Sequence, residues 1–280
     1  MVVNIPALDN NRFSSWKDTI GRVAFMNCDP LFLQLGDDWN VLSAPPSWLT
    51  GHLLRRDCVI APIPAADYAK NSSELVLLPD LGICSKGEVG SVLLFGSMPI
   101  EAMDSISLPS DSSSSVALLK YILKQKGLDP KLTVMGPDID SMLSVSDGAL
   151  IIGDRALDAS KKHPSKVVLD LGLEWQNISG CPMVFGVFAA RRDTPLSSIR
   201  KAYDSLLEQL VEFENNESRR DLIVELSASN SGLSVARLDQ YFGEVFNRLD
   251  DEHINGLNRF LKKACSLTPV SYTHLRAHET

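Results

Sequence analysis

The stretch that decides the fold reads Ser105-Ile-Ser-Leu-Pro-Ser-Asp-Ser-Ser-Ser-Ser-Val-Ala-Leu-Leu-Lys-Tyr-Ile-Leu-Lys-Gln-Lys126. Its apolar residues recur at the spacing of one helix face, namely Val116, Leu119, Ile122 and Leu123. The helix is expected to begin near Ser113, with its N-cap at Ser110, Asp111 or Ser112. A strand end therefore opens directly into a helix whose first turn consists of hydroxyl side chains.

This helix start is suited to binding an anion. The first backbone N–H groups of a helix have no partner within it, and they carry partial positive charge. Small hydroxyl side chains around them favour a carboxylate or a phosphate group. The same composition is also typical of a serine-rich surface loop that only caps a helix, so the run alone leaves both interpretations open.

The composition indicates an ordinary globular protein with an acidic balance. The chain has 280 residues, of which 44% are hydrophobic and 22% charged, and this suits one large domain or two moderate ones. Its formal net charge is −8, without a basic tract. We therefore expect no nucleic-acid partner and no membrane partner, and any bound anion should be small and held in a local pocket.

The cysteines and the N-terminus indicate a cytoplasmic protein. The five cysteines are scattered, without a C-x-x-C pair, which is typical of thiols in a reducing compartment and not of a disulfide frame. The N-terminus lacks the charged and apolar regions of a signal peptide, and no apolar run is long enough to span a bilayer.

Strands and helices alternate along the first two thirds of the chain, which predicts α/β structure with a parallel sheet. The expected strands are 21–26, 39–42, 57–62, 75–78, 91–96, 132–135, 149–152, 167–169 and 182–189. The expected helices are 30–33, 47–54, the helix from Ser113, 138–145, and most of the chain after 197. Segment 182–189 is apolar on both faces and should be a central strand.

We expect two α/β lobes with a ligand cleft between them. Lobe 1 is expected to comprise residues 1–100 and 190–268, and lobe 2 residues 101–189, with crossings at 97–104 and 186–192. Residues 269–280 are assigned to a non-native tail, since the segment from Ser271 resembles the translated read-through of a sequencing-library adaptor.

The sequence offers little acid–base or metal chemistry. His52, His163 and His253 lie far apart, without an H-E-x-x-H motif or a cysteine partner. Neither a nucleophile elbow nor a phosphate-binding glycine motif occurs. No metal and no cofactor are therefore expected. What remains are strand-end loops rich in Asn, Ser, Gly and Asp, which would orient and polarise a ligand.

Six segments in a fixed order carry a resemblance to a known family. They are Asn27-Cys-Asp-Pro-Leu31, Gly87-Glu-Val-Gly-Ser-Val92, the serine-rich helix start, Ile152-Gly-Asp-Arg-Ala-Leu157, Asp170-Leu-Gly-Leu-Glu-Trp175 and Pro182-Met-Val-Phe-Gly-Val-Phe-Ala-Ala-Arg191. From Gly21 to Cys265 the chain resembles the chorismate dehydratases of the futalosine route to menaquinone. The resemblance implies a cytoplasmic, two-lobed enzyme similar to type II periplasmic binding proteins. It also implies that chorismate is converted into 3-[(1-carboxyvinyl)oxy]benzoate and water.

The resemblance also implies a site. Asn27 and Ser91 match the polar residues that face the reacting ring, and the run around Ser113 and Ser114 matches the loop that holds a carboxylate. Ser112, Gly153 and Asp154 complete the expected substrate-binding set. Asp29 and Met183 depart from the family, where an uncharged residue and Phe are usual, and Ser113 and Ser114 replace a more varied run that often contains threonine. Because no His, Glu or Lys base is evident, we expect the enolpyruvyl carboxylate of the substrate to take the proton.

Several alternatives remain open at this point. Asn27 could only cap the helix at Pro30, Ser91 could only begin a strand, and Asp154 could only cap a helix. Two other functions share the expected fold, a solute-binding protein and an enzyme that makes 1,4-dihydroxy-6-naphthoate. The segment Asn27-Cys-Asp-Pro-Leu31 favours the dehydratase over the latter.

Overall fold

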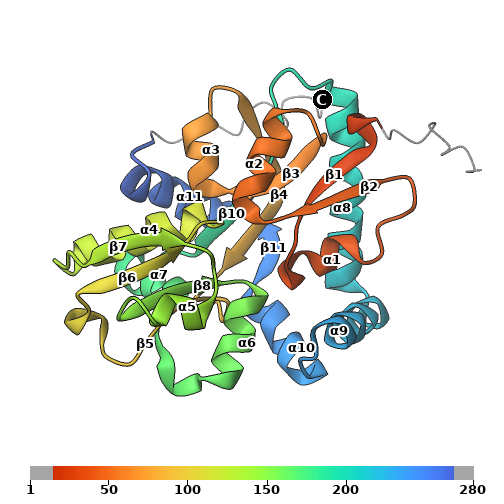
Figure 1. Cartoon of the computed structure of the whole chain (residues 1–280). Helices are drawn as coiled ribbons and strands as arrows, with labels where there is room; N and C mark the ends of the chain where they lie inside the picture. Colours follow the sequence, from red (N-terminus) through yellow and green to blue (C-terminus); the bar gives the residue numbers. More distant parts are fainter. Residues whose placement is uncertain (1–14, 268–280) are drawn as a thin grey trace, which may run out of the picture.

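The computed structural model describes residues 15–267, and these form two sheets with helices packed around them (Figure 1). The first sheet has the order β11-β4-β10-β3-β1-β2, with bounds β1 Thr19–Val23, β2 Asn40–Ala44, β3 Ile60–Pro64, β4 Leu75–Ser85, β10 Met183–Arg191 and β11 Phe246–Leu249. The second has the order β7-β6-β8-β5-β9, with bounds β5 Val92–Gly96, β6 Ser105–Pro109, β7 Lys131–Met135, β8 Gly148–Ile152 and β9 Val167–Asp170. The expected tail, 269–280, lies outside the described residues.

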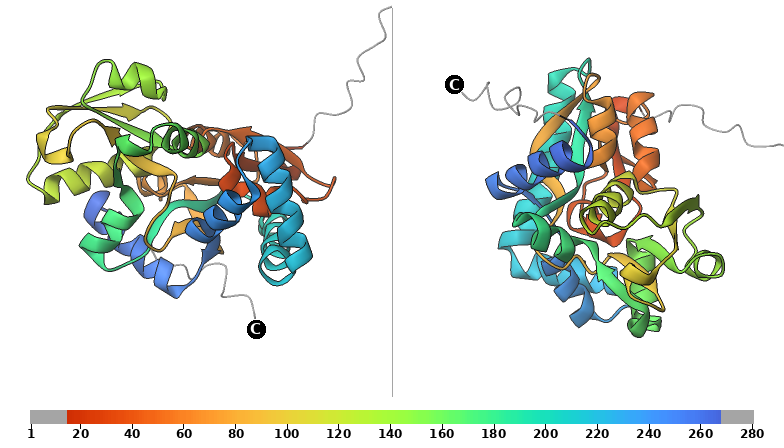
Figure 2. Two further views of the ribbon diagram at one scale, coloured as in Figure 1. Left: turned by 90° about the horizontal axis from the view of Figure 1, so that it is seen from below. Right: turned by 90° about the vertical axis from the view of Figure 1, so that its left-hand side faces the viewer.

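The helices group with one sheet or the other. Around the first sheet lie α1 Asp29–Phe32, α2 Pro46–Leu54, α3 Ala65–Asn71, α8 Leu196–Asn215, α9 Glu217–Ser231, α10 Val235–Glu244 and α11 Asp251–Ala264. Around the second lie α4 Ser113–Gln125, α5 Ile139–Leu143, α6 Asp154–Lys162 and α7 Leu171–Ser179. The views of Figure 2 show the two groups side by side, as the expected two-lobed arrangement requires.

The sheets are mixed, whereas the sequence predicted parallel pairing. β1 is parallel to β2 and β3, but β10 is antiparallel to both of its neighbours, β3 and β4. The reason is that β10 returns from the second sheet and inserts between two strands that run the other way. Its central place agrees with its expected position, because a strand buried on both faces must be apolar throughout.

The chain passes between the sheets at other points than expected. β5, which the boundary at residue 100 assigned to lobe 1, pairs with β8 and β9 of the second sheet. β10, assigned to lobe 2 up to residue 189, lies in the first sheet. The crossings therefore follow β4 and precede β10. One apolar cluster runs through both sheets, and a smaller second cluster belongs to the second sheet, so the division into two domains stays a prediction.

One strand of the first sheet is longer than expected, and another was missed. β4 is a single strand that extends to Ser85, beyond the expected end at residue 78. β11 covers Phe246, which the sequence placed in a helix, and pairs antiparallel to β4. Four residues with alternating burial are too short to stand out beside long helical patterns.

Helix α4 confirms the prediction from the serine run. It begins at Ser113 with Ser112 at its N-cap. The ring of Trp175 packs edge-on against Tyr121 of α4 and Phe260 of α11, and its Nε1 donates to the Pro182 carbonyl at 3.0 Å. Trp175 is thus a core residue, and it fixes α4 against the strand that returns to the first sheet.

Candidate functional site

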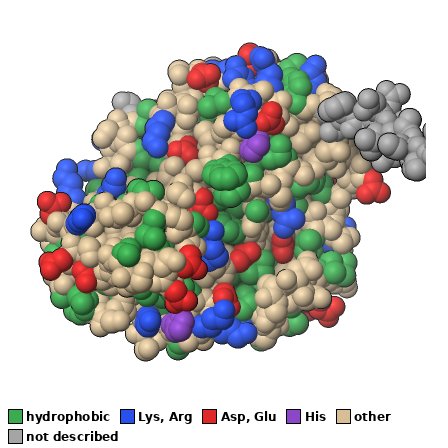
Figure 3. Space-filling view, in the orientation of Figure 1, with side chains coloured by type: hydrophobic (Ala, Val, Ile, Leu, Met, Phe, Trp, Pro, Cys, Tyr) green, Lys and Arg blue, Asp and Glu red, His purple; other side chains and the backbone are tan. Residues whose placement is uncertain are grey.

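A pocket lies where the two lobes meet. Figure 3 shows hydrophobic side chains gathered in the middle of this face, with acidic and basic side chains beside them. The lining of the pocket is apolar except for five polar side chains, those of Asn27, Ser91, Ser112, Ser114 and Ser115. The apolar part comes from both lobes and comprises Val23, Phe25, Pro46, Ile63, Pro64, Ile83, Val89, Val92, Ile152, Phe185 and Val245. Such a lining suits a ring that carries a few polar substituents.

Asn27 lies in the 3-10 turn Met26–Cys28 that follows β1, and its side chain is buried. Its Oδ1 atom has no hydrogen-bond partner among the described residues. The position that precedes α1 is occupied by Cys28, so the alternative of Asn27 as a helix cap is wrong. Because a buried amide oxygen without a partner is unfavourable, this atom is available to a ligand. Burial raises the pKa of the adjacent Cys28 thiol to about 12, which keeps the thiol neutral.

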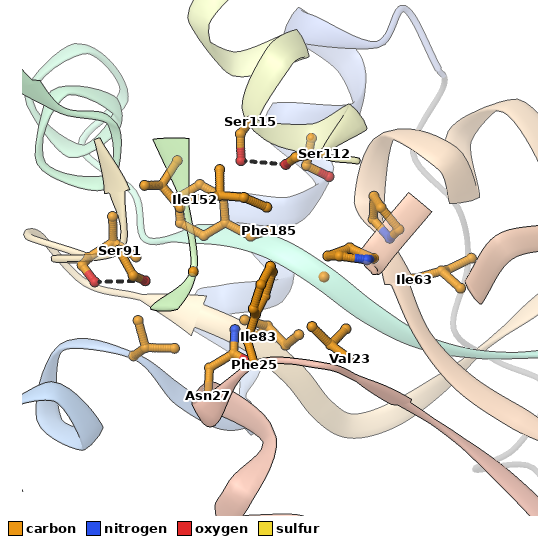
Figure 4. Close-up of a pocket in the computed structure, with 18 residues that line it drawn as sticks. Val23, Phe25, Asn27, Ile63, Ile83, Ser91, Ser112, Ser115, Ile152 and Phe185 are labelled. Atoms are coloured by element: carbon orange, nitrogen blue, oxygen red, sulfur yellow. Dashed lines mark hydrogen bonds between the residues drawn. The ribbon is translucent and has the colours of Figure 1, made fainter. Parts of the chain in front are cut away.

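Ser91 directly precedes β5 and is buried. Its Oγ donates to the Val89 carbonyl at 3.3 Å (Figure 4) and accepts from Tyr241 Oη at 3.1 Å. Its own carbonyl accepts from the Gly153 amide at 2.7 Å. The Ser91 hydroxyl is therefore held at the pocket wall by its own loop and by Tyr241 from the C-terminal part of the chain.

The serine run divides into two orientations. Ser112 and Ser115 line the pocket and share a hydrogen bond of 2.8 Å between their Oγ atoms. Ser114 also lines it, and its Oγ accepts from the Ala66 amide at 3.1 Å. Ser113 lies outside the pocket lining, with its Oγ 3.1 Å from Ser47 Oγ. Of the expected serines the structure thus brings Ser112 and Ser114 to the pocket, and it adds Ser115.

Gly153 lines the pocket because the chain there comes very close to Phe25. A Cβ at Gly153 would lie 2.7 Å from the Phe25 ring, and its φ of 62° with ψ of −146° is a conformation that only glycine adopts readily. Figure 4 shows this ring in the middle of the pocket, between Asn27 and the helix start with Ser112. Sequence reasoning missed Phe25, although an aromatic residue just after the first strand, two residues before Asn27, could have suggested a ligand contact.

Asp154 does not line this pocket. Its carboxylate accepts from the Met26 amide at 3.0 and 3.3 Å, so it caps a 3-10 turn that belongs to the other lobe. This supports the alternative that Asp154 is a capping residue. The element that it caps is the 3-10 turn Met26–Cys28 and not an α-helix. It lies in a second cavity of about 610 Å³, which also touches Phe25.

Asp29 faces that second cavity and not the pocket. Its carboxylate pairs with Arg22 and accepts from Ser227 Oγ at 2.6 Å. Burial raises its pKa, while Ser227 and Arg22 lower it. Asp29 therefore forms a structural ion pair beside the site.

Arg155, in the first turn of α6, contacts the Phe25 ring. Its guanidinium lies over the Phe25 ring at 5.4 Å and pairs with Asp111 at 2.5 Å.

In residues 15–267 no group of three His, Cys, Asp or Glu side chains could hold a metal ion, and no helix is long and apolar enough to cross a membrane.

Comparisons with known proteins identify relatives over nearly the whole described chain. A family model described as "Menaquinone biosynthesis" matches residues 19–266. A chorismate dehydratase of Thermus thermophilus is 32% identical over 223 residues, which cover 72% of this chain and 82% of that protein. A chorismate dehydratase of Campylobacter jejuni is 26% identical over 256 residues, covering 88% and 96%.

Solved structures agree on the fold. A protein of Archaeoglobus fulgidus matches with a TM-score of 0.71 at 16% identity, covering 90% of this chain and 98% of that one. A Candida albicans protein described as having the generic periplasmic binding protein fold matches with a TM-score of 0.64 at 17% identity, covering 90% and 91%. The fold is therefore like that of periplasmic binding proteins, as expected, with the pocket in the cleft between the lobes.

Proposed function

The chain belongs to the menaquinone biosynthesis family, and on that premise we propose that it is a chorismate dehydratase. As a hydro-lyase it converts chorismate into 3-[(1-carboxyvinyl)oxy]benzoate and water. The observation that carries the proposal is a set of neutral polar side chains, Asn27, Ser91, Ser112 and Ser114, in an otherwise apolar pocket between the lobes. A cytoplasmic location belongs to the same proposal.

The substrate is a dianion with one ring, and the pocket suits its parts. The ring lies among the apolar side chains around Phe25 and Phe185. One carboxylate lies at the start of α4, where the helix charge and the hydroxyls of Ser112 and Ser114 stabilise it. Asn27 Oδ1, which has no partner in the described chain, faces the reacting end.

The reaction removes a ring hydrogen and a ring hydroxyl, and the product is aromatic. Among the described residues that line the pocket there is no His, Lys, Asp or Glu, so the enolpyruvyl carboxylate of the substrate takes the proton. A base held within the same molecule acts at a high effective concentration once the reactive conformation is fixed. Asn27 and Ser91 hold that conformation and bind the departing hydroxyl.

The pocket must open to admit the substrate. Its free volume is about 50 Å³, room for only a few water molecules. The contacts of Gly153 and Asp154 with residues 25 and 26 hold the lobes together at this point. Closure of two lobes around a ligand is the ordinary motion of such folds.

Incubation of the pure protein with chorismate tests the proposal. We expect the absorbance of an aromatic product and an equal loss of chorismate. Binding of chorismate without turnover would indicate a binding protein, and neither binding nor turnover would contradict the proposal. A chorismate analogue that lacks the enolpyruvyl carboxylate should bind without reacting, and its turnover at a normal rate would overturn the substrate-assisted step.

A further inference from the structure

Tyr241 reaches the Ser91 hydroxyl from the far end of the chain. It lies on α10, its side chain is fully buried, and its Oη donates to Ser91 Oγ at 3.1 Å. It does not line the pocket itself. Tyr241 can therefore act on a ligand only through Ser91.

The backbone at Ser91 is held by other groups. The Asp170 carboxylate accepts the amides of Val89 and Gly90 at 3.0 and 2.8 Å, and the Gly153 amide donates to the Ser91 carbonyl. Gly90, with φ of 63°, lies so close to the Arg237–Glu244 ion pair that a Cβ would overlap it. These contacts fix the backbone of the loop. The Ser91 hydroxyl can still rotate, and the hydrogen bond from Tyr241 restricts that rotation.

We propose that Tyr241 is a positioning residue for the dehydration, which aims the Ser91 hydroxyl at the departing hydroxyl of the substrate. By donating to Ser91 Oγ it occupies an acceptor site, so the single Ser91 proton must point elsewhere. In this structure that proton goes to the Val89 carbonyl at 3.3 Å, which is long for a hydroxyl donor and readily exchanged for a ligand oxygen. The proposal rests on the proposed function.

Tyr241 supplies no proton to the reaction. Burial raises its pKa far above the usual value, so the phenol stays protonated and remains a donor. The proton that leaves the ring carbon and the hydroxide that leaves the ring together make the water, so no acid from the protein is needed.

Tyr241→Phe keeps the ring and removes only the hydroxyl. We expect kcat for chorismate to fall about tenfold with KM changed less than twofold, since one hydrogen bond is lost. In a Ser91→Ala background the same substitution should change kcat less than twofold, because the two residues act as one unit. Tyr203→Phe is the matched control, since it removes a phenol hydrogen bond to Asp80 between two residues that do not line the pocket, and it should leave kcat unchanged.

An equal fall of kcat in both backgrounds, or no fall in the wild-type background, would overturn the proposal. A crystal structure of Tyr241→Phe gives a second readout that needs no turnover. Ser91 Oγ should then occupy more than one rotamer, and a single unchanged rotamer would count against a positioning role. If the wild-type protein left chorismate unchanged, the proposed function would fail, while the rotamers would still decide whether Tyr241 positions Ser91.

Discussion

The Asp154 carboxylate of one lobe accepts the Met26 amide of the other at 3.0 Å. Met26 begins the 3-10 turn that carries Asn27, and that turn has no cap from its own side chains. Asp154 thus supplies, across the cleft, the partner that the turn lacks. Gly153, the residue before Asp154, lies against Phe25. Gly153 and Asp154 therefore couple closure of the lobes to the position of Asn27.

Asp154 should make stability depend on pH in an identifiable way. Burial raises its pKa from 3.8 to about 6, against the lowering effect of the Met26 hydrogen bond. The folded protein therefore binds this proton more tightly than the unfolded chain. Its contribution to the free energy of unfolding is complete below about pH 3.8 and is lost as pH rises to about 6.

Asp154→Asn removes that titration. Denaturant unfolding at several pH values should show that wild-type stability, relative to the variant, decreases between pH 4 and pH 6.5. Asp158→Asn is the control, because Asp158 lies in the same cavity with an exposed carboxylate paired to Lys162. A difference that stays constant over this range would mean that Asp154 is not buried as described.

Gly153→Ala should weaken both folding and substrate binding. Its backbone conformation excludes other residues, and a Cβ would overlap the Phe25 ring. We expect a loss of about 1–3 kcal/mol in the free energy of unfolding, with a raised KM for chorismate. Gly36→Ala, where a Cβ meets nothing within 4 Å, should change neither quantity. Equal behaviour of the two variants would refute the close contact.

The sequence predicted those parts of the fold that have a strong local signal. The apolar spacing after Ser113 defined α4, and the apolar run of β10 defined a central strand. The direction of β10 and the existence of β11 depend on pairing between distant segments, which no local pattern specifies. For the site, too, the local motifs could be predicted and the contacts between distant segments could not.

Asn27, Ser91 and Ser112 were proposed from motifs, and they do line one pocket. That Ser113 points away, and that Tyr241 contacts Ser91 across 150 residues, could not be predicted because both depend on how the lobes meet. A helix start specifies which hydroxyls lie near it, but the neighbouring lobe decides which of them face the cleft.

Ser114→Ala and Ser113→Ala form a matched pair on one helix turn. Ser114 lines the pocket, so its loss should weaken chorismate binding roughly ten- to a hundredfold, as for a charge-assisted hydrogen bond. Ser113 contacts Ser47, so its loss should change affinity less than twofold. Calorimetric titration compares them, and melting temperatures control for the Ala66 contact of Ser114. Equal affinities would assign the serine run to helix capping alone.

Asn27→Ala should act on the chemical step. The amide is neutral at every physiological pH, so it can align and polarise the substrate but cannot take the ring proton. We expect kcat to fall roughly a hundred- to a thousandfold, as when a polar side chain that stabilises developing charge is removed, with a modest change in KM. Asn40→Ala, on the exposed strand β2, is the control and should retain full activity.

The same kinetic assay locates the base. If the substrate carboxylate takes the proton, Asp154→Asn should retain substantial turnover, since Asp154 is engaged with the Met26 amide and lies outside the pocket lining. Loss of turnover in Asp154→Asn, with chorismate binding and melting temperature preserved, would mean that the protein supplies the base. Asn27 would then orient the substrate toward Asp154, and the analogue without the enolpyruvyl carboxylate should react after all.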